Sequence, residues 1–241
     1  MNLDYFYKKF DFQSDFLFDG FNNMEKLMIK SQMEFIEFSK GQRLFYEGGS
    51  PSGVFFLKEG KAKKFKSGIN NEHQIFYIYS KGDLLGYHAV LGKERYEDSC
   101  EALERCVVGF IRTPVFDELR KQLKRLNELL IKNLGHEFGV LANIIGVMAQ
   151  NSLNSRLAIF LLILENKYRD NVYPRRIEMS RENLANMIGT SRESLGRSLK
   201  EFRDKGYIQI QNKGIEIVDR ASLINVSGVQ IPDNDQPKVH Y

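Results

Sequence analysis

The 241-residue sequence predicts an α+β protein made of a β-roll, a long helix and a winged helix-turn-helix. Three patterns support this class: short alternating apolar runs between glycines, then a heptad-spaced apolar stripe, then two short helical patterns followed by a hairpin. We expect the β-roll, a jelly roll, over residues 1–114 and the long helix over residues 115–152. The winged helix-turn-helix domain, with a polar C-terminal tail, should occupy residues 153–241.

Composition narrows the class of protein. Hydrophobic content of 42% and charged content of 27% are ordinary for a soluble globular chain. The net charge is +4, and residues 153–241 hold 14 Lys or Arg against 11 Asp or Glu, a mild bias that suits DNA. Two cysteines give no disulfide framework, and the longest apolar run, residues 157–164, is too short to span a bilayer. Since the start does not have the pattern of a signal peptide, we expect a soluble, cytoplasmic protein with no membrane partner.

The first domain contains five runs that predict strands. They lie at residues 35–38, 54–57, 62–65, 74–79 and 106–111. Glycines fall between them, and several short strands at about 8–12-residue spacing are typical of a β-sandwich or jelly roll.

Residues 115–152 predict a long helix with a coiled-coil seam. Its apolar side chains step by 4, 3, 4 and 3 residues, which is the heptad spacing. They are Leu134, Phe138, Leu141, Ile145 and Met148. The simplest partner for such a seam is a second copy of the chain, so we expect a homodimer. The alternative is a helix packed only on its own domain.

A stripe of small residues runs beside this seam with the same rhythm. It consists of Gly135, Gly139, Ala142, Gly146 and Ala149. Glycines inside a helix lower its stability relative to alanine, while small side chains let another backbone approach closely. We expect this face to lie against the β-roll or against a ligand between roll and helix.

Residues 180–206 predict two short helices joined by a tight turn. Apolar residues at helical spacing give each helix one face to bury. They are Leu184, Met187 and Ile188 in the first helix and Leu195, Leu199 and Phe202 in the second. Gly189 suits the end of the first helix, and Thr190 stands three residues before Glu193, the spacing of a capping box. We therefore expect the second helix to begin at Thr190.

A hairpin pattern follows the two helices. Alternating residues 207–210 and 215–218 flank the turn-type residues 211–214. A helix-turn-helix followed by such a hairpin is a winged helix.

The outward face of the second helix carries Arg192, Glu193, Arg197 and Lys200. Arginine can donate two hydrogen bonds to guanine, and glutamate can accept one from the amine of cytosine. At the start of a helix inserted in the major groove, such groups reach base edges. Gly196 lies among them and suggests a close approach, either to the first helix or to a DNA backbone. The alternative is a charged face that is merely solvated.

Residues 190–197, with the sequence Thr-Ser-Arg-Glu-Ser-Leu-Gly-Arg, closely resemble the recognition helix of the CRP/FNR family of bacterial transcription regulators. The resemblance implies that Arg192, Glu193 and Arg197 read a TGTGA-like half-site. It also implies a set of phosphate-contacting residues. These are Arg181, Thr190, Ser191, Ser194 and Lys200. The implied partners are double-stranded DNA, a second copy of the chain and RNA polymerase.

The first domain resembles the same family. Residues 47–60 are similar to the signature of the cyclic-nucleotide-binding-type β-roll, and residues 81–86 are similar to the lead-in to its phosphate-binding cassette. Together with the recognition helix, these segments extend the resemblance over nearly the whole chain. It implies allosteric control by a small effector bound in the roll.

The expected effector pocket departs from the pattern of the family's cyclic-AMP-binding members. Its candidate residues are Gly86, Tyr87, His88, Arg95, Leu141 and Ala142. Tyr87 stands where those members have a ribose-binding glutamate, and Leu141-Ala142 stands where they have an adenine-contacting Thr-Ser pair. We therefore expect an unidentified effector or none, and not cyclic AMP. We expect Arg95 to form an ion pair with a nearby carboxylate and not to bind a phosphate. The nearby carboxylates are Glu97, Asp98 and Glu101.

The sequence supports no metal site. Cys100 and Cys106 are too few for an iron–sulfur cluster, which needs about four thiolates, so this cofactor is excluded within one chain. The other histidines lack metal-ligand spacing. His88 could serve as an axial ligand, so a haem-based gas-sensing regulator stays an alternative, although a lone histidine is more often a surface or hydrogen-bonded residue.

The expected function is that of a sequence-specific, homodimeric transcription regulator and not of an enzyme. The sequence holds no nucleophile–base motif, metal cluster or phosphate-cradling glycine loop. One alternative of another class remains: a ligand-binding or interaction module of the same fold that has lost its DNA function.

Overall fold

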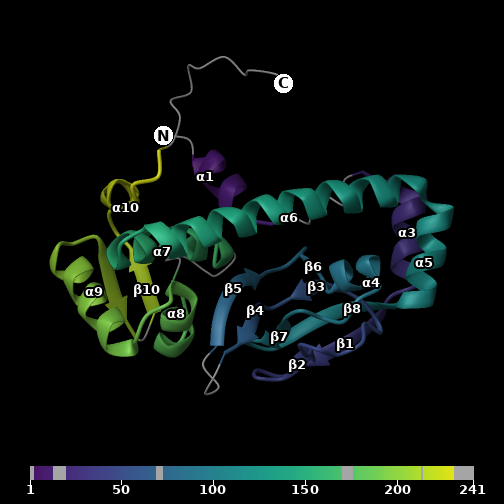
Figure 1. Cartoon of the computed structure of the whole chain (residues 1–241), viewed down its shortest axis with the longest axis horizontal. Coiled ribbons are helices and arrows are strands. Elements are labelled where there is room, and N and C mark those ends of the chain that lie inside the picture. The colour runs from purple at the N-terminus through teal and green to yellow at the C-terminus, as the bar shows by residue number, and fades with distance from the viewer. Residues whose placement is uncertain (1–2, 13–19, 69–72, 170–175, 213, 231–241) are drawn as a thin grey trace, which may run out of the picture. The chain divides into compact units, whose positions relative to one another are not determined.

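The computed structural model describes residues 3–12, 20–68, 73–169, 176–212 and 214–230 (Figure 1). The chain forms two compact units. The roll unit is Phe12–Phe138, and the helix-turn-helix unit joins Met1–Asp11 to Gly139–Tyr241. This division falls inside helix α6 (Lys124–Gln150), so each unit holds part of that helix.

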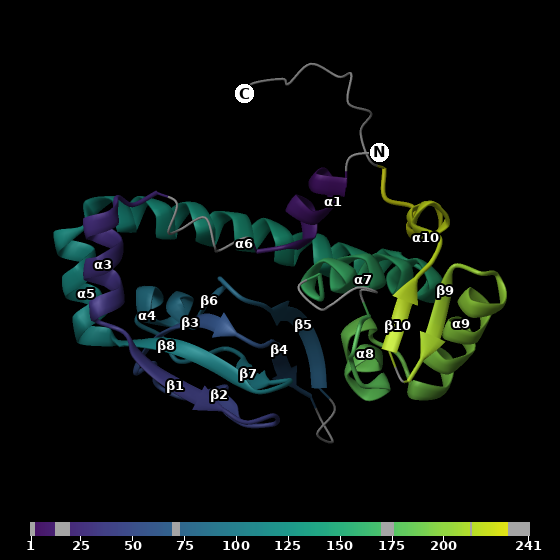
Figure 2. The same cartoon turned by 180° about the vertical axis from the view of Figure 1, so that it is seen from behind.

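The roll unit is a β-sandwich, which confirms the predicted jelly-roll class (Figure 2). Two four-stranded antiparallel sheets have the orders β1-β8-β3-β6 and β2-β7-β4-β5. The strands are β1 (Glu34–Phe38), β2 (Arg43–Phe45), β3 (Gly53–Glu59), β4 (Ala62–Ser67), β5 (His73–Tyr79), β6 (Leu84–Leu85), β7 (Ser99–Ala102) and β8 (Cys106–Arg112). All five predicted strands are present. The three that the sequence did not predict, β2, β6 and β7, have two to four residues, too few to display alternation.

The helices of the roll unit are α3 (Asn23–Ser31), α4 (Tyr87–Gly92), α5 (Thr113–Gln122) and the first part of α6. A hydrophobic cluster joins α3, α5 and α6 to the sheet of β3 and β8; it includes Ile29, Val54, Ile111, Phe116 and Leu130. The single helix expected over residues 115–152 is wrong in one respect, because Leu123 adopts φ −109° and ψ 80° and separates α5 from α6. No proline or glycine marks this break in the sequence.

The helix-turn-helix unit contains the predicted winged helix-turn-helix. Its elements are α1 (Leu3–Phe10), the end of α6, α7 (Leu153–Lys167), α8 (Arg181–Ile188), α9 (Arg192–Asp204), β9 (Ile208–Gln211), β10 (Gly214–Ile217) and α10 (Arg220–Ser227). Every residue of α7 from 157 to 164 is buried, as befits a helix that is apolar all round and central to its unit. Helices α1, α8, α9 and α10 pack on α7 (Figure 1).

The N-terminal helix α1 accounts for a difference from the predicted domain boundaries at residues 114 and 152. Its Phe6 and Phe10 are buried, and it contacts α7, so residues 1–11 group with the C-terminal part of the chain. Asp11 anchors the end of this segment through an ion pair with Lys167 Nζ at 2.6 Å, and both side chains are largely buried. The predicted polar tail, from residue 231 on, lies outside the described residues.

Candidate functional site

Helix α8 begins at a serine cap and presents an arginine. The Ser180 hydroxyl accepts a hydrogen bond from the backbone N–H of Asn183 at 3.1 Å. The side chain of Arg181, the next residue, is about half buried, and its Nη1 is enclosed without a hydrogen-bond partner among the described residues. Desolvation lowers the pKa of this guanidinium from its ordinary value, although it stays a cation at neutral pH. Arg181 is therefore a partly desolvated cation at the first residue of α8.

The turn between α8 and α9 is tight. Gly189 adopts φ 63°, the left-handed conformation that favours glycine at a helix end, and the N–H of Thr190 donates to the carbonyl of Ala185. The predicted capping box at Thr190 is wrong by one residue. The cap is Ser191, whose hydroxyl accepts from the backbone N–H of Ser194 at 3.2 Å. Both Ser191 and Thr190 suit a cap, so the sequence alone favoured the residue with a glutamate three places on.

One face of α9 is buried and the other is exposed. Leu195, Leu199 and Phe202 are buried as predicted. Arg192, Glu193, Arg197 and Lys200 are exposed. The helical period therefore places the four charged side chains that were predicted to contact DNA on the solvent side.

Two members of the exposed face are held in place locally. Hydrogen bonds from its own backbone N–H and from the Ser191 hydroxyl lower the pKa of Glu193, so this side chain is an ionised acceptor at neutral pH. Arg197 Nη2 donates to the Ser194 hydroxyl at 2.7 Å. That contact uses one nitrogen of the guanidinium group. Arg197 must therefore leave the serine before two of its nitrogens can donate hydrogen bonds to a base.

Gly196 lies in the middle of this face with open space above it. A Cβ atom built there would meet no atom within 4 Å. Close packing of α8 is therefore not the reason for this glycine, and that half of the sequence interpretation is wrong. The approach of a partner backbone to α9 is unobstructed at this point.

The hairpin next to α9 brings a basic residue that the sequence analysis missed. Strands β9 and β10 pair in register from Gly214↔Gln211 to Ile217↔Ile208. Arg176 Nη2 donates to Gln211 Oε1 at 2.9 Å near the hairpin turn. Residue 177 pairs with Ile215 in an isolated bridge, and only this long-range pairing brings Arg176 to the wing. Lys213, in the predicted turn, lies outside the described residues.

The predicted effector pocket in the roll is filled by its own side chains. Tyr87 is 1% exposed, and its hydroxyl accepts from Asn133 Nδ2 at 2.7 Å. The same Asn133 amide donates to Glu137 Oε1 at 2.8 Å, and the Tyr87 hydroxyl also bonds to Glu137. Gly86, just before Tyr87, adopts φ 74°, and a Cβ there would press on the Tyr96 ring at 3.2 Å. This network links α4 to α6 within the roll unit.

His88 lies beside a buried ion pair. Lys64 Nζ and Asp98 Oδ2 are 2.7 Å apart, and His88 Nε2 is 3.5 Å from the same oxygen. Burial and the nearby Lys64 charge lower the pKa of His88 to about 4, so the imidazole is neutral at physiological pH. Its Nε2 is enclosed and faces Asp98, which leaves this nitrogen no open approach for an iron atom. His88 therefore does not fit the haem alternative through Nε2.

Arg95 does not have the carboxylate partners that the sequence suggested. It is exposed and donates from Nη1 to the carbonyl of Gly48 at 2.7 Å. The neighbouring carboxylates pair elsewhere, since Lys64 holds Asp98 and Lys66 holds Glu97, while Lys63 holds Glu101. Strand pairing of β4 with β7 brings these lysines across from the acidic residues, and sequence distance alone does not reveal it.

The other two candidate pocket residues, Leu141 and Ala142, belong to the helix-turn-helix unit. Leu141 is half-buried, and Ala142 is exposed and borders a pocket of that unit. Their side chains offer no hydrogen bond to a ligand.

The predicted seam on α6 is only partly buried in the single chain. Phe138 is 76% exposed, Ile145 is 67% exposed and Leu134 is 39% exposed, while Leu141 and Met148 are half-buried. The expectation that the neighbouring glycine stripe lies against the roll or a ligand is wrong. A Cβ at Gly135, Gly139 or Gly146 would meet no atom of the described chain within 4 Å.

The described residues contain no group of three or more His, Cys, Asp or Glu side chains that could hold a metal ion. Both cysteines are buried and unpaired. Among the described helices, none is long and apolar enough to cross a membrane.

Two family profiles together match most of the chain. The profile described as a cyclic nucleotide-binding domain matches residues 35–122, and the one described as a Crp-like helix-turn-helix domain matches residues 155–226. The fumarate and nitrate reduction regulatory protein of Vibrio cholerae is 26% identical over 193 residues, which cover 79% of this chain and 77% of that protein. The transcriptional activator protein Anr of Pseudomonas aeruginosa is 28% identical over 195 residues, 80% of each chain.

Solved structures share the fold. FixK2 from Bradyrhizobium japonicum superposes with a TM-score of 0.72 at 16% identity, covering 83% of this chain and 99% of that chain. A CRP/FNR-family transcriptional regulator from Thermus thermophilus has a TM-score of 0.66 at 22% identity, covering 80% of this chain and 98% of that chain. At these identities the likeness shows the fold alone.

The network of Tyr87, Asn133 and Glu137 makes a pH-dependent contribution to stability. Burial raises the pKa of Glu137 from 4.5 to about 7, so the folded chain holds a proton that the unfolded chain releases. This contribution is complete below about pH 4.5 and is lost as the pH rises through 7. Glu137→Gln imitates the protonated form. Its free energy of unfolding, relative to the unaltered protein, should therefore rise by about 3 kcal/mol between pH 4.5 and pH 7.5, measured by urea unfolding followed by circular dichroism.

His88→Gln is the matched control with the opposite sign. The lowered pKa of His88 gives stability that is present above its ordinary pKa of 6.5 and is lost as the pH falls through about 4. Relative to the unaltered protein, this variant should lose stability as the pH rises over that interval. Two variants with the same pH dependence as the unaltered protein would show that neither group is buried as described.

Proposed function

Because the chain belongs to the CRP/FNR family of bacterial transcription regulators, we propose that it acts as a homodimer on a palindromic TGTGA-like DNA site. The family consists of DNA-binding transcription regulators and not of enzymes. The observation that carries the proposal is the exposed, unobstructed face of α9 with its two arginines and one ionised glutamate. A small effector, not yet identified, controls the protein, and the DNA-bound dimer works with RNA polymerase.

Three side chains of α9 read bases. Arg192 and Arg197 each offer the bidentate donor that suits the O6 and N7 atoms of guanine, and Glu193 offers the acceptor that suits the amine of cytosine. They lie in the first turns of α9, the part of a recognition helix that reaches base edges in the major groove. Open space over Gly196 supports a close approach of DNA to this helix.

A second set of side chains holds the phosphate backbone. Arg181 places a half-buried cation at the start of α8, where a phosphate oxygen can pair with the accessible part of its guanidinium. Ser191 and Ser194 carry hydroxyls at the positive end of α9, where the helix dipole favours an anion. Thr190 and Lys200 lie at either end of the same face.

The exposed apolar seam of α6 forms the dimer interface. Burying a large apolar side chain stabilises an interface by about 1.5–3 kcal/mol, and Leu134, Phe138 and Ile145 are all available for it. The open glycine stripe lets a second helix approach the backbone of α6 closely. In the dimer, two α9 helices would enter successive major grooves about 34 Å apart.

The effector acts by differential affinity for DNA-competent and DNA-incompetent arrangements of the protein. Cyclic AMP is not this effector, because the buried and mutually hydrogen-bonded Tyr87 and Glu137 occupy the predicted pocket. Arg95, the candidate phosphate ligand, is engaged by the backbone of Gly48.

Arg192→Ala and Arg197→Ala should each weaken binding to a TGTGA-N6-TCACA duplex by about 1–3 kcal/mol and relax its specificity. Fluorescence anisotropy at one stated salt concentration measures this. Arg203→Ala is the control, since Arg203 is exposed on the same helix but is paired with Asp204 at 2.9 Å. An equal loss on a scrambled duplex would make the altered arginine a phosphate contact and refute its base-reading role.

Phe138→Glu should convert the dimer to a monomer, because it places a charge in the centre of the apolar seam. Sedimentation equilibrium measures the outcome. Met24→Glu is the matched control, since Met24 is also 76% exposed but lies on α3, away from the seam. A dimer that survives Phe138→Glu at micromolar concentration would exclude this face as the interface.

Titration calorimetry of the full chain with cyclic AMP should give no saturable heat, because the pocket is occupied by hydrogen-bonded side chains. Saturable binding would contradict the account of the filled pocket.

A further inference from the structure

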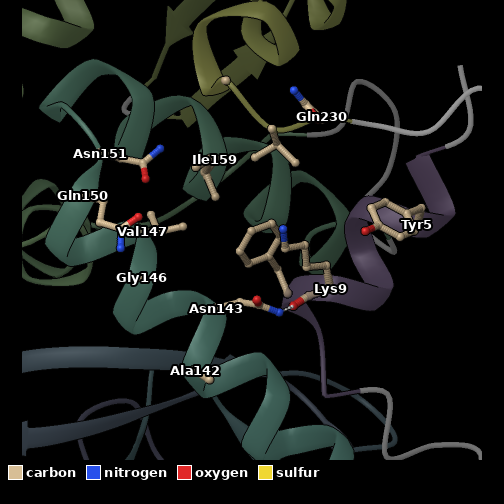
Figure 3. A pocket seen from close by; sticks show the side chains of 13 residues that line it. Tyr5, Lys9, Ala142, Asn143, Gly146, Val147, Gln150, Asn151, Ile159 and Gln230 are labelled. Carbon is tan, nitrogen blue, oxygen red and sulfur yellow. Dashed lines mark hydrogen bonds between the residues drawn. The ribbon is translucent and has the colours of Figure 1, made fainter.

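The helix-turn-helix unit contains a pocket with a volume of about 860 Å³ (Figure 3). Its walls come from α1, the end of α6, the middle of α7 and the segment that follows α10. Pockets for small molecules commonly have volumes of about 300–1,000 Å³, so this one is large enough for an organic ligand.

This pocket is separate from the proposed DNA-contacting surface and from the roll unit, although Ala142 and Gly146 of the small-residue stripe on α6 also line it. None of its lining residues belongs to the DNA-contacting set or to the roll unit. Apart from Ile159, its lining residues also lie outside the segments 35–122 and 155–226 that match the family profiles. The architecture shared with the family therefore does not account for it.

The lining combines apolar surface with one positive charge. Phe10, Val147 and Ile159 form a packed apolar floor, and the exposed Tyr5 and Ala142 offer carbon surface to a ligand. Among the described residues that line the pocket, Lys9 alone carries a charge, and its Nζ lies 5.8 Å from the centre of the Phe10 ring. No carboxylate of the described chain pairs with it. Figure 3 shows Lys9 and Tyr5 extending from α1 toward the α6 and α7 side chains across the pocket.

The walls are held in place before any ligand binds. Asn143 Nδ2 on α6 donates to the carbonyl of Lys9 on α1 at 3.0 Å. The buried pair of Asp11 and Lys167 anchors the end of the α1 segment to α7, and Asn166 Nδ2 also donates to Asp11 at 3.2 Å. A preformed pocket spares a ligand the cost of ordering it.

We propose that this pocket binds a small organic anion with an apolar portion, such as an aromatic or branched carboxylate or sulfonate. The anionic group pairs with Lys9, and the apolar portion lies against Tyr5, Ala142 and the edge of Val147. Charge-assisted hydrogen bonds of this kind are among the stronger polar contacts, and the apolar contacts supply the remaining affinity.

The pocket also borders the junction of α6 and α7. Asn151, one of its lining residues, donates to the Ser155 hydroxyl at 2.7 Å across that junction. A ligand that contacts α1, α6 and α7 together favours one arrangement of the junction and thereby changes DNA affinity. This consequence rests on the proposed DNA-binding function, whereas binding in the pocket does not.

The direct test uses anilinonaphthalene sulfonate, an aromatic anion whose fluorescence rises on binding, and its uncharged analogue N-phenylnaphthylamine. The full-length protein should bind the sulfonate with one saturable site. Lys9→Gln should weaken sulfonate binding about tenfold and leave the uncharged probe unchanged. Lys8→Gln is the matched control, because Lys8 is the exposed neighbour that does not line the pocket, and it should change neither.

A second pair of variants tests whether the probes bind in this pocket, by adding side-chain volume inside it or outside it. Gly146→Leu places a side chain into the pocket from a position where a Cβ meets no atom, so it should abolish binding of both probes without a steric clash. Gly139→Leu has equally open surroundings on the same helix but lies outside the pocket and should leave binding intact. Sedimentation of each variant separates an altered dimer from a filled pocket.

Unchanged sulfonate binding in both Lys9→Gln and Gly146→Leu would overturn the proposal, and so would the absence of saturable binding. Binding that appears only after removal of residues 231–241 would also overturn it, because the chain would then fill its own pocket. Anisotropy on DNA is measured separately with and without the sulfonate. Loss of DNA selectivity with normal probe binding would refute the DNA-binding proposal and leave the pocket standing.

Discussion

Burial of one face of α9 is the constraint on which the DNA-contacting surface depends. Leu195, Leu199 and Phe202 are each nearly inaccessible, so rotation of this helix about its axis would expose large apolar side chains to water. The 3.6-residue period then leaves Arg192 and Arg197 no orientation except outward. Glycine at 189 and the Ser191 cap set where the helix begins, and therefore which residues occupy its first turns. The chemistry available to a base edge follows from these apolar contacts on the opposite side.

The long helix α6 joins two kinds of interaction at adjacent residues. Glu137 faces inward and is hydrogen-bonded to Asn133 and Tyr87, while Phe138, the next residue, is largely exposed on the seam. Any change that moves Glu137 therefore also turns Phe138, since both are fixed to the same helical backbone. In this chain a carboxylate and a tyrosine occupy the interior position. The pocket bordered by α1 offers a different place from which a small molecule can act on the junction that follows α6.

Local periodicity was enough to predict the main elements. The alternation at residues 74–79 and 106–111 and the helical spacing of Leu195, Leu199 and Phe202 correspond to the observed strands and helix. Local periodicity did not predict the features that depend on contacts between residues far apart in the sequence. Strand β7 contains Glu101 and is short, and it is defined by pairing with β2 and β4. The break at Leu123 has no sequence signal, and Ser191 competes with Thr190 as a cap on nearly equal terms.

Partners distant in sequence explain the remaining errors at the candidate site. Arg95 has three carboxylates within the six residues that follow it, yet it bonds to the carbonyl of Gly48, because lysines of β4 pair with those carboxylates. The docking of α1 depends on Asp11 meeting Lys167, a contact across most of the chain length. No local pattern encodes either pairing. The pocket that α1 helps to build was therefore invisible in the sequence.

The central claim is that α9 reads a specific half-site, and the most direct measurement is the affinity of the unaltered, effector-free protein for two duplexes. Fluorescence anisotropy compares TGTGA-N6-TCACA with a scrambled sequence of the same length and composition at one salt concentration. The account predicts a preference of about 10³-fold or more for the palindrome, which is in the range of specific binding. Equal affinity for the two duplexes would contradict the assignment of Arg192, Glu193 and Arg197 as readers of this site.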